Sequence, residues 1–244
     1  SSLSHTTAKE WHGFKQHKPG QPRRRDPQNA QPDRLLDVVM VPPGTPIPAE
    51  TALIILPGSK TTIADMQAIR AGGWDIDILA HHRRGGMILG ICGGYQMLGR
   101  IIDDPSGLEG PPARSAGLGL LDVQTRIETR KILRHVVGTA LGAAFTGYEI
   151  HMGTTTGADT GRPFSQLDTG QPDGAISADG RVMGTYCHAT FASTPFRREL
   201  LRRLGTNSAG TDYTHSLDTA LDEIARTLEQ NLNISGLLEL SLPF

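Results

Sequence analysis

The sequence predicts an α/β fold built on an open, mostly parallel β-sheet flanked by helices. Short apolar runs recur along the chain with helical patterns between them. Residues 52–56 are apolar at every position, which is typical of a strand buried on both faces of a parallel sheet. Strand, helix and strand at this spacing form a right-handed βαβ unit, so these observations favour a parallel core.

The predicted elements follow in order along the chain. Strands are expected at residues 36–41, 52–56, 87–91 and 182–186. Between the second and third strands, a helical pattern places Ile76, Leu79 and Ala80 on one face. A second helical pattern follows the third strand and continues to Ile102. The region 117–187 is rich in strand patterns that glycines interrupt.

Two amphipathic helices are expected to close the chain. The first is capped by Thr194, with Pro195 at the first helical position. Its apolar stripe comprises Phe196, Leu200, Leu201 and Leu204. The second has its stripe at Leu217, Ala220, Leu221, Ile224 and Leu228. Both stripes are expected to pack into the core.

The composition favours a globular, cytoplasmic protein. Hydrophobic residues make up 37% of the chain and charged residues 20%, and no apolar run reaches the about 18 residues that a membrane helix needs. The net charge of −1 supplies no global field to attract nucleic acid. Two cysteines cannot build a disulfide framework, so we expect a reducing compartment and no membrane or nucleic-acid partner.

Residues 1–33 differ from the rest of the chain. They are basic and proline-rich, with almost no aliphatic residues and no periodicity of a strand or helix. We expect a flexible segment here, followed by one domain over residues 34–244. The run Arg23-Arg24-Arg25 leaves a nucleic-acid-binding tail as an alternative, although no aromatic residues lie between the arginines.

The strongest chemical signal is the segment Gly90–Gly99, where an apolar strand leads into Gly-Ile-Cys-Gly-Gly and then into a helical pattern. This is the layout of a nucleophile elbow with sulfur in place of the hydroxyl. Glycines permit the sharp turn that lifts Cys92 above the carboxyl edge of the sheet. The N-terminus of the next helix favours a thiolate there. A buried structural cysteine beside a tight turn is the alternative interpretation.

A cysteine nucleophile needs a general base, and nine histidines compete for that role. His188 follows a predicted strand, so it is expected at the same edge of the sheet as Cys92. His151 is its rival. His81 and His82 stand near the end of a predicted helix, where we expect them to be solvated.

The segment Pro57-Gly58-Ser59-Lys60 directly follows the second strand. Glycine lets the backbone come close to a ligand, so the N–H groups of Gly58 and Gly93 are expected to form an oxyanion pocket. The segment lacks the glycine order of a phosphate loop, which argues against nucleotide binding. No Cys or His pair has metal-ligand spacing, so no metal site is expected.

Four segments together resemble the C-terminal glutamine amidotransferase domain of cobyric acid synthases: Ile54–Asp65, Gly90–Gly99, Gly147–Gly153 and Gly184–His188. The resemblance covers roughly residues 34–240. The first segment is the most specific, because other class I amidotransferases usually carry a second glycine where this chain has Ser59-Lys60. The resemblance implies a flavodoxin-like class I glutamine amidotransferase fold.

The resemblance also implies a role for each matching residue. Cys92 would attack the side-chain amide of glutamine to form a thioester, and His188 would transfer the protons. Gly58 and Gly93 would hold the oxyanion. The substrate-binding residues would be Ser59, Gln96, Glu149 and His151.

In that family, the released ammonia amidates side-chain carboxylates of a corrinoid, and ATP activates each carboxylate. The domain that does so precedes the amidotransferase domain and is absent from this chain. The resemblance therefore implies L-glutamine as substrate and a synthetase domain or subunit as partner. ATP and Mg²⁺ are expected only in that partner, and no cofactor is expected in this domain.

The chain departs from the family pattern in places. The stretch Trp11–Asp26 is basic and proline-rich where the family begins with an apolar strand, so a sheet strand is expected to be missing. Thr190 stands where many class I amidotransferases carry a glutamate, which leaves Glu149 as the candidate to orient His188. Two alternative functions stay open: an amidotransferase subunit for a peptidoglycan lipid precursor, and a non-catalytic binding or regulatory module.

Overall fold

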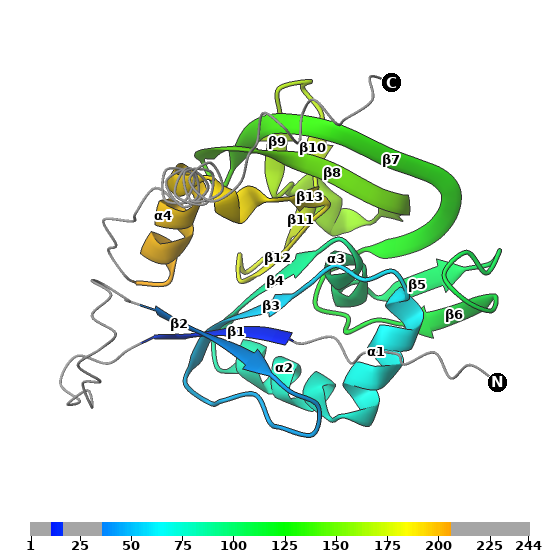
Figure 1. The fold of residues 1–244 in the computed structure, drawn as a ribbon, viewed down its shortest axis with the longest axis horizontal. Helices are drawn as coiled ribbons and strands as arrows, with labels where there is room; N and C mark the ends of the chain where they lie inside the picture. The colour runs from blue at the N-terminus through cyan, green and yellow to red at the C-terminus, as the bar shows by residue number, and fades with distance from the viewer. Residues whose placement is uncertain (1–10, 17–35, 206–244) are drawn as a thin grey trace, which may run out of the picture.

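The computed structural model describes residues 11–16 and 36–205. Two sheets form the fold, and the first has six strands in the order β11-β12-β4-β3-β1-β2. Its strands are β1 Trp11–Gln16, β2 Leu36–Val41, β3 Thr51–Leu56, β4 Met87–Ile91, β11 Ala175–Ile176 and β12 Val182–Thr185. In Figure 1, helices α1 and α2 lie on one side of this sheet and the second sheet lies on the other.

The first sheet is mixed rather than mostly parallel, so that part of the predicted fold class is wrong. Strands β12, β4 and β3 pair in parallel, whereas β11, β1 and β2 pair antiparallel with their neighbours. Strand β2 lies at the edge, and its Val38 and Met40 are 55% and 36% exposed. Val41 on the opposite face is buried. This strand is therefore half-buried, as expected for an edge strand with one face toward the core.

Strand β1 lies within the stretch that was expected to be a flexible segment. It pairs with β2 on one side and with β3 on the other. The expected gap in the sheet is therefore filled by residues of the basic, proline-rich stretch. The division into a segment at 1–33 and a domain at 34–244 stays a prediction.

Helices α1 Thr62–Ala71 and α2 Trp74–Arg83 connect β3 to the parallel strand β4, which confirms the predicted βαβ unit. The face predicted for α2 is only partly buried, since Leu79 and Ala80 are half-buried. Ile76 is 66% exposed, while Trp74 and Ile78, four residues apart, point into the core. His81 continues this face and is buried, with its Nε2 3.0 Å from the carbonyl of Met87, so it is not solvated as expected.

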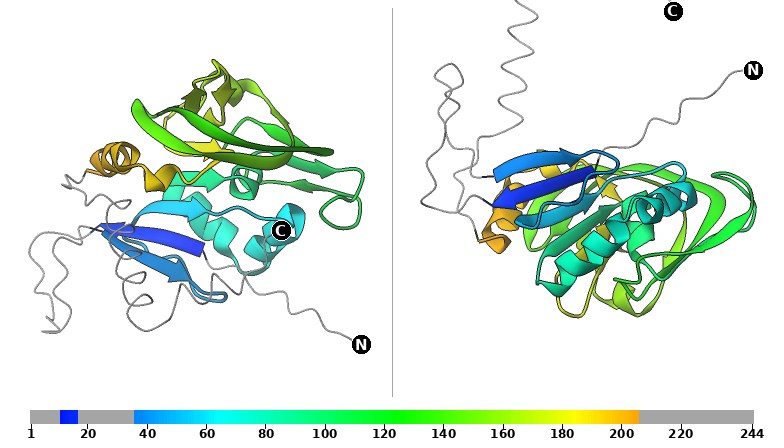
Figure 2. Two further views of the ribbon diagram at one scale, coloured as in Figure 1. Left: turned by 45° about the horizontal axis from the view of Figure 1, so that its top comes forward. Right: turned by 90° about the horizontal axis from the view of Figure 1, so that it is seen from below.

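Most of the second sheet comes from the strand-rich region 117–187, as predicted, although its first two strands in the sequence precede that region. Its strands are β5 Ile101–Asp104, β6 Ala113–Ala116, β7 Gln124–Ala140, β8 Ala143–Thr156, β9 Ser165–Leu167, β10 Pro172–Asp173 and β13 Cys187–His188. The predicted helix through Ile102 is wrong, because the chain becomes extended at Gly99 and continues as β5. Figure 2 shows the long β7–β8 hairpin arching over the first sheet.

Helix α4 Thr194–Arg203 packs against this hairpin. Its N-cap is Ser193 rather than Thr194, and Phe196 and Leu200 are buried as predicted. The last predicted helix, with its stripe from Leu217 to Leu228, lies outside the described residues. Two short 3-10 helices, η1 Ala158–Gly161 and η2 Thr190–Ala192, complete the secondary structure described.

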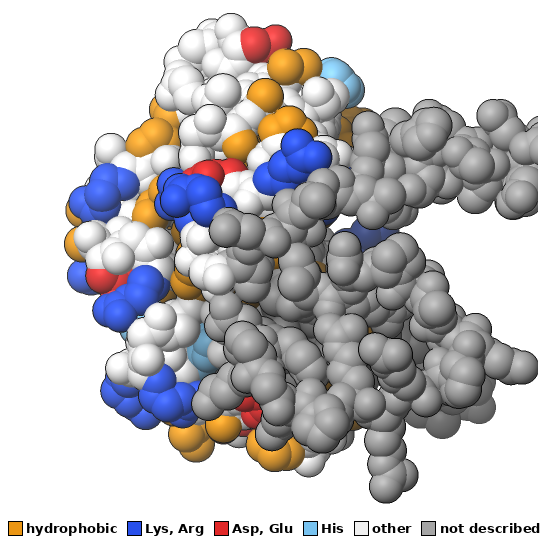
Figure 3. All heavy atoms as spheres, turned by 90° about the vertical axis from the view of Figure 1, so that its left-hand side faces the viewer, with side chains coloured by type: hydrophobic (Ala, Val, Ile, Leu, Met, Phe, Trp, Pro, Cys, Tyr) orange, Lys and Arg blue, Asp and Glu red, His pale blue; other side chains and the backbone are white. Residues whose placement is uncertain are grey.

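Apolar side chains fill both sides of the first sheet. One cluster lies on the side of α1 and α2 and includes Met66, Ile69 and Ile88. The other includes Leu53 and Leu89 and lies against α4 and the hairpin. Charged side chains of both signs are interspersed on the described part of the face in Figure 3. Within residues 36–205, no helix has the length and apolar character to cross a membrane.

Candidate active site

Cys92 lies at the sharp turn between β4 and helix α3 Gly93–Leu98. Its φ of 52° and ψ of −113° are strained for a residue with a side chain, as the elbow pattern predicts. The Cys92 N–H donates to the carbonyl of Thr185 on β12, 2.8 Å away, and the Gln96 N–H donates to the carbonyl of Cys92. Neighbouring elements therefore hold the turn from both sides.

The elbow needs glycine because α3 lies very close to the sheet. A Cβ atom on Gly94 would stand 2.0 Å from the carbonyl oxygen of Leu56 on β3. A Cβ atom on Gly90 would stand 2.6 Å from the backbone of Gly94. Real Cβ atoms essentially never approach within 3.0 Å of other heavy atoms, so larger residues would push the helix away.

The two cysteines of the chain differ in their surroundings. Cys92 is partly exposed and stands at a helix N-terminus. Its thiol donates to the carbonyl of Ile150 at 3.4 Å. Cys187 is fully buried, and burial raises the pKa of its thiol far above the ordinary value. The exposure of Cys92 and its place at a helix N-terminus make it, rather than Cys187, the candidate nucleophile.

Cys92 opens into a cavity of about 840 Å³ at the carboxyl ends of β3 and β4. The predicted site residues that line this cavity are Gly58, Ser59, Cys92, Gln96, His151 and His188. Gly93 and Glu149 are not among the lining residues. Gly93 nevertheless lies beside Ser59, because a Cβ atom on Gly93 would stand 2.7 Å from the Cβ of Ser59.

His188 faces the same part of the cavity as Cys92. A Cβ atom built on Gly58 would lie 3.5 Å from Cε1 of His188 and 3.6 Å from Cβ of Cys92, so both side chains lie close to one point. The imidazole stacks on the ring of Tyr148, with the ring centroids 5.1 Å apart and an angle of 4° between the planes. Its Nε2 is buried without a hydrogen-bond partner among the described residues.

The pKa of His188 is lowered from its ordinary value. Burial is the main cause, and the nearby His151 lowers the pKa further, whereas the backbone of Ile150 raises it. The imidazole is therefore neutral at pH 7. A neutral imidazole with a free nitrogen can accept a proton from a thiol.

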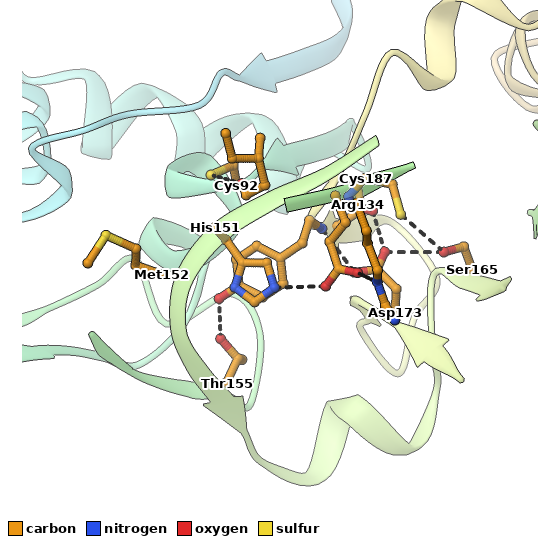
Figure 4. Close-up of polar contacts among 12 residues, drawn as sticks. Cys92, Arg134, His151, Met152, Thr155, Ser165, Asp173 and Cys187 are labelled. Atoms are coloured by element: carbon orange, nitrogen blue, oxygen red, sulfur yellow. Dashed lines mark hydrogen bonds and ion pairs between the residues drawn. The ribbon is translucent and has the colours of Figure 1, made fainter. Parts of the chain in front are cut away.

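His151, the rival base, is held firmly by its neighbours. Its Nε2–H donates to Glu149 at 2.8 Å, and its ring stacks on Tyr186 with the centroids 3.8 Å apart. Arg134 donates to the second carboxylate oxygen of Glu149 at 2.6 Å. Hydrogen bonds from His151 and Arg134 lower the pKa of Glu149. Figure 4 shows His151 and Arg134 within this group.

These contacts overturn the hypothesis that Glu149 orients His188. Both carboxylate oxygens of Glu149 are occupied by His151 and Arg134. Glu149 contacts the cavity through His151, and the pairing of β8 with β13 places it opposite Cys187. Among the described residues, no carboxylate forms a hydrogen bond or ion pair with His188.

Gln96 and Ser59 are also held by contacts within the protein. Gln96 is buried, its Oε1 accepts from Thr62 at 3.1 Å, and its Nε2 donates to Tyr186 and to the carbonyl of Met152, each at 3.3 Å. The hydroxyl of Ser59 donates to Asp65 and accepts from the Thr61 N–H. Both side chains therefore shape the cavity wall.

Among the described residues, four charged ones line the cavity: Lys60 and Asp65 lie within the segment that the sequence singled out, whereas Lys131 and Glu109 lie outside every such segment. Lys131 reaches the cavity after the register of β7 shifts between Arg126 and Lys131. Glu109 reaches it from the loop between β5 and β6 and accepts from the Thr62 N–H at 2.7 Å. Neither position carries a motif that sets it apart in the sequence. Residues 11–16 and 36–205 contain no group of three or more His, Cys, Asp or Glu suited to hold a metal ion.

Comparison with known proteins fits this geometry. Residues 30–196 match the family described as the CobB/CobQ-like glutamine amidotransferase domain. The chain belongs to this family. The CobB/CobQ-like domain has an α/β class I glutamine amidotransferase-like fold, which agrees with the elbow on β4.

Curated relatives share more than half of their aligned residues with the chain. A protein of Rhizorhabdus wittichii named cobyric acid synthase is 56% identical over 216 residues, which are 88% of this chain and 44% of the relative. A protein of the same name from Novosphingobium aromaticivorans is 58% identical over 207 residues, 85% of this chain and 42% of the relative. The match covers the C-terminal part of these proteins. The chain thus spans less than half of their length.

Solved structures are much less similar. One titled "Crystal structure of glutamine amidotransferase" is 17% identical, with a TM-score of 0.45 over 64% of this chain and 80% of that chain. One titled "Structure of PurLQS from Thermotoga maritima" is 18% identical, with a TM-score of 0.46 over 64% of this chain and 81% of that chain.

Proposed function

We propose that this amidotransferase domain hydrolyses L-glutamine through a thioester on Cys92, with His188 as general base and acid. The observation that carries the proposal is that a cysteine on a strained elbow and a half-buried, neutral histidine from another strand face one cavity. That pair can generate a thiolate and return its proton to a leaving group.

The reaction follows from this placement. His188 takes the thiol proton as the sulfur of Cys92 attacks the amide carbon of the glutamine side chain. The N–H groups of Gly58 and Gly93 hold the oxyanion, and collapse of the intermediate breaks the C–N bond as His188 protonates the amide nitrogen, which leaves as ammonia. Water, deprotonated by His188, then attacks the thioester, and glutamate and the free thiol form.

The charges of the cavity wall suit an α-amino acid. Lys131 would attract the α-carboxylate and Glu109 the α-ammonium group, so the two residues would orient the zwitterion. Ser59 and Gln96 would contact the bound glutamine through the wall that they form. Glu149 would act through His151, which it holds at the edge of the cavity.

For the whole protein, we propose that the ammonia serves ATP-dependent amidation of corrinoid carboxylates. The relatives named cobyric acid synthase support this acceptor over a peptidoglycan lipid precursor. A synthetase part corresponding to the remainder of these relatives would bind ATP, Mg²⁺ and the corrinoid. Both cysteines are free thiols, which suits a reducing compartment. We therefore propose that the protein acts in the cytoplasm.

The test is ammonia release from L-glutamine. The natural chain and Cys187→Ala, which removes the buried thiol, should both release ammonia, whereas Cys92→Ala should release none above background. Failure of the natural chain, alone and with the N-terminal part of the Rhizorhabdus wittichii relative, would favour a non-catalytic module. Equal loss in both cysteine variants would contradict the assignment of the nucleophile.

A further inference from the structure

The relative position of Cys92 and His188 depends on one short stretch of chain. Strand β12 belongs to the first sheet and β13 to the second, and Tyr186 alone separates them. The carbonyl of Thr185, at the end of β12, accepts from the Cys92 N–H at 2.8 Å. His188 ends β13. The bend between the two sheets therefore sets the geometry of the catalytic pair.

Asp173 lies against this bend and is itself 7% exposed. Its carboxylate accepts from the Thr185 hydroxyl at 2.5 Å and from the Tyr186 N–H at 3.1 Å. The Thr185 hydroxyl in turn accepts from the Cys187 N–H at 2.9 Å. The Ser165 hydroxyl donates to the same carboxylate from the neighbouring strand β9. Figure 4 shows Asp173 linked to Ser165 beside Cys187.

We propose that Asp173 is a positioning residue for the catalytic pair. In this chain it would hold the catalytic histidine in place from a distance, in the absence of the glutamate that many class I amidotransferases carry where this chain has Thr190. The inference rests on the proposed function. Asp173 does not line the cavity, so it acts through the backbone of the bend rather than on glutamine. No described carboxylate bonds to His188, and Glu149 is bound to His151 and Arg134. The Asp173–Thr185 hydrogen bond is thus the side-chain contact that joins Asp173 to the end of β12, and the Tyr186 N–H and Cys187 N–H bonds complete the polar contacts at the bend.

Two substitutions at Thr185 separate this role from a packing role. Thr185→Val keeps the shape of the side chain but removes the hydroxyl, so Asp173 loses one of its three donors and the Cys187 N–H loses its acceptor. Thr185→Ser keeps the hydroxyl and loses only a methyl group. We expect Thr185→Val to lower kcat for glutamine hydrolysis by at least about 10-fold with little change in KM, because a shift of the reacting groups of about 1 Å can cost 100-fold. Thr185→Ser should stay close to the natural kcat.

Asp173→Asn provides a second variant should Thr185→Val not fold, and it should lower kcat likewise. Asp159→Asn is the matched control: Asp159 is also buried and accepts from a backbone N–H, that of Asp122 at 2.7 Å, but it does not line the cavity or touch the bend. It should lower the free energy of unfolding without lowering the kcat of the folded protein.

Alkylation of Cys92 by iodoacetamide gives a readout that does not require glutamine hydrolysis. The rate should fall in Thr185→Val and Asp173→Asn and stay unchanged in Thr185→Ser and Asp159→Asn. A natural chain that is inactive both alone and with the N-terminal part of the Rhizorhabdus wittichii relative would refute the proposed function, and the alkylation rates would still test the position of His188. Natural kcat and alkylation rates in Thr185→Val and Asp173→Asn would overturn the inference, as would an equal loss in Asp159→Asn.

Discussion

Substitution of Gly94 by alanine tests whether close contact between α3 and β3 builds the elbow. The new Cβ would stand 2.0 Å from the carbonyl oxygen and 2.6 Å from the carbonyl carbon of Leu56. To reach the 3.0 Å that real Cβ atoms keep, the helix and the strand must separate by about 1 Å. Both clashing atoms are backbone, so no side-chain rotation relieves the contact.

We expect Gly94→Ala to lower the free energy of unfolding by about 3 kcal/mol, at the upper end of the cost of overpacking. Since Cys92 directly precedes α3, the same 1 Å displacement should lower kcat/KM for glutamine by about 100-fold. Urea unfolding and ammonia release measure the two quantities. The control is Gly161→Ala, whose Cβ would have no atom within 4 Å and which should leave both unchanged. A Gly94→Ala protein as stable and as active as the natural chain would refute the reasoning.

Four further predictions concern the titrating groups. Iodoacetamide should modify Cys92 and spare Cys187, as peptide mass spectrometry would show, because burial raises the pKa of the Cys187 thiol. Since burial lowers the pKa of His188, the acidic limb of the pH profile of kcat/KM should lie below pH 6.5; a limb above that value would contradict its assignment as base. Burial also lowers the pKa of His81, so the unfolded state binds a proton at a higher pH than the folded state does. The free energy of unfolding should therefore fall as the pH drops below 6.5. His81→Gln should reduce the dependence of the free energy of unfolding on pH, as measured by urea titrations. Glu149→Gln should lower the free energy of unfolding by about 2 kcal/mol, since it weakens two charged hydrogen bonds, and an unchanged urea midpoint would contradict this.

The sequence predicted those features that depend on local chemistry. The elbow was visible because the glycines around Cys92 meet a steric need that stands beside the cysteine in the sequence. His188 could be placed opposite Cys92 because the carboxyl ends of β12 and β4, which pair in parallel, meet at one edge of the sheet.

The features that were missed depend on contacts distant in the sequence. Strand β1 forms by antiparallel pairing with β2 and β3, and its composition carries no strand pattern. Helical spacing groups Ile76 with Leu79 and Ala80, yet Trp74 and Ile78 form the buried face of the same helix. Lys131 enters the cavity through a register shift that depends on the partner strand β8.

The most direct test of the account is to trap the thioester. The protein is mixed with L-glutamine, quenched in acid during turnover and digested, and the peptides are examined by mass spectrometry. We predict a glutamyl adduct on the peptide that contains Cys92, more abundant in His188→Asn if thioester hydrolysis slows more than its formation, and absent from the peptide of Cys187. Turnover without an adduct on Cys92, or an adduct on Cys187, would contradict the assignment of Cys92 as the nucleophile.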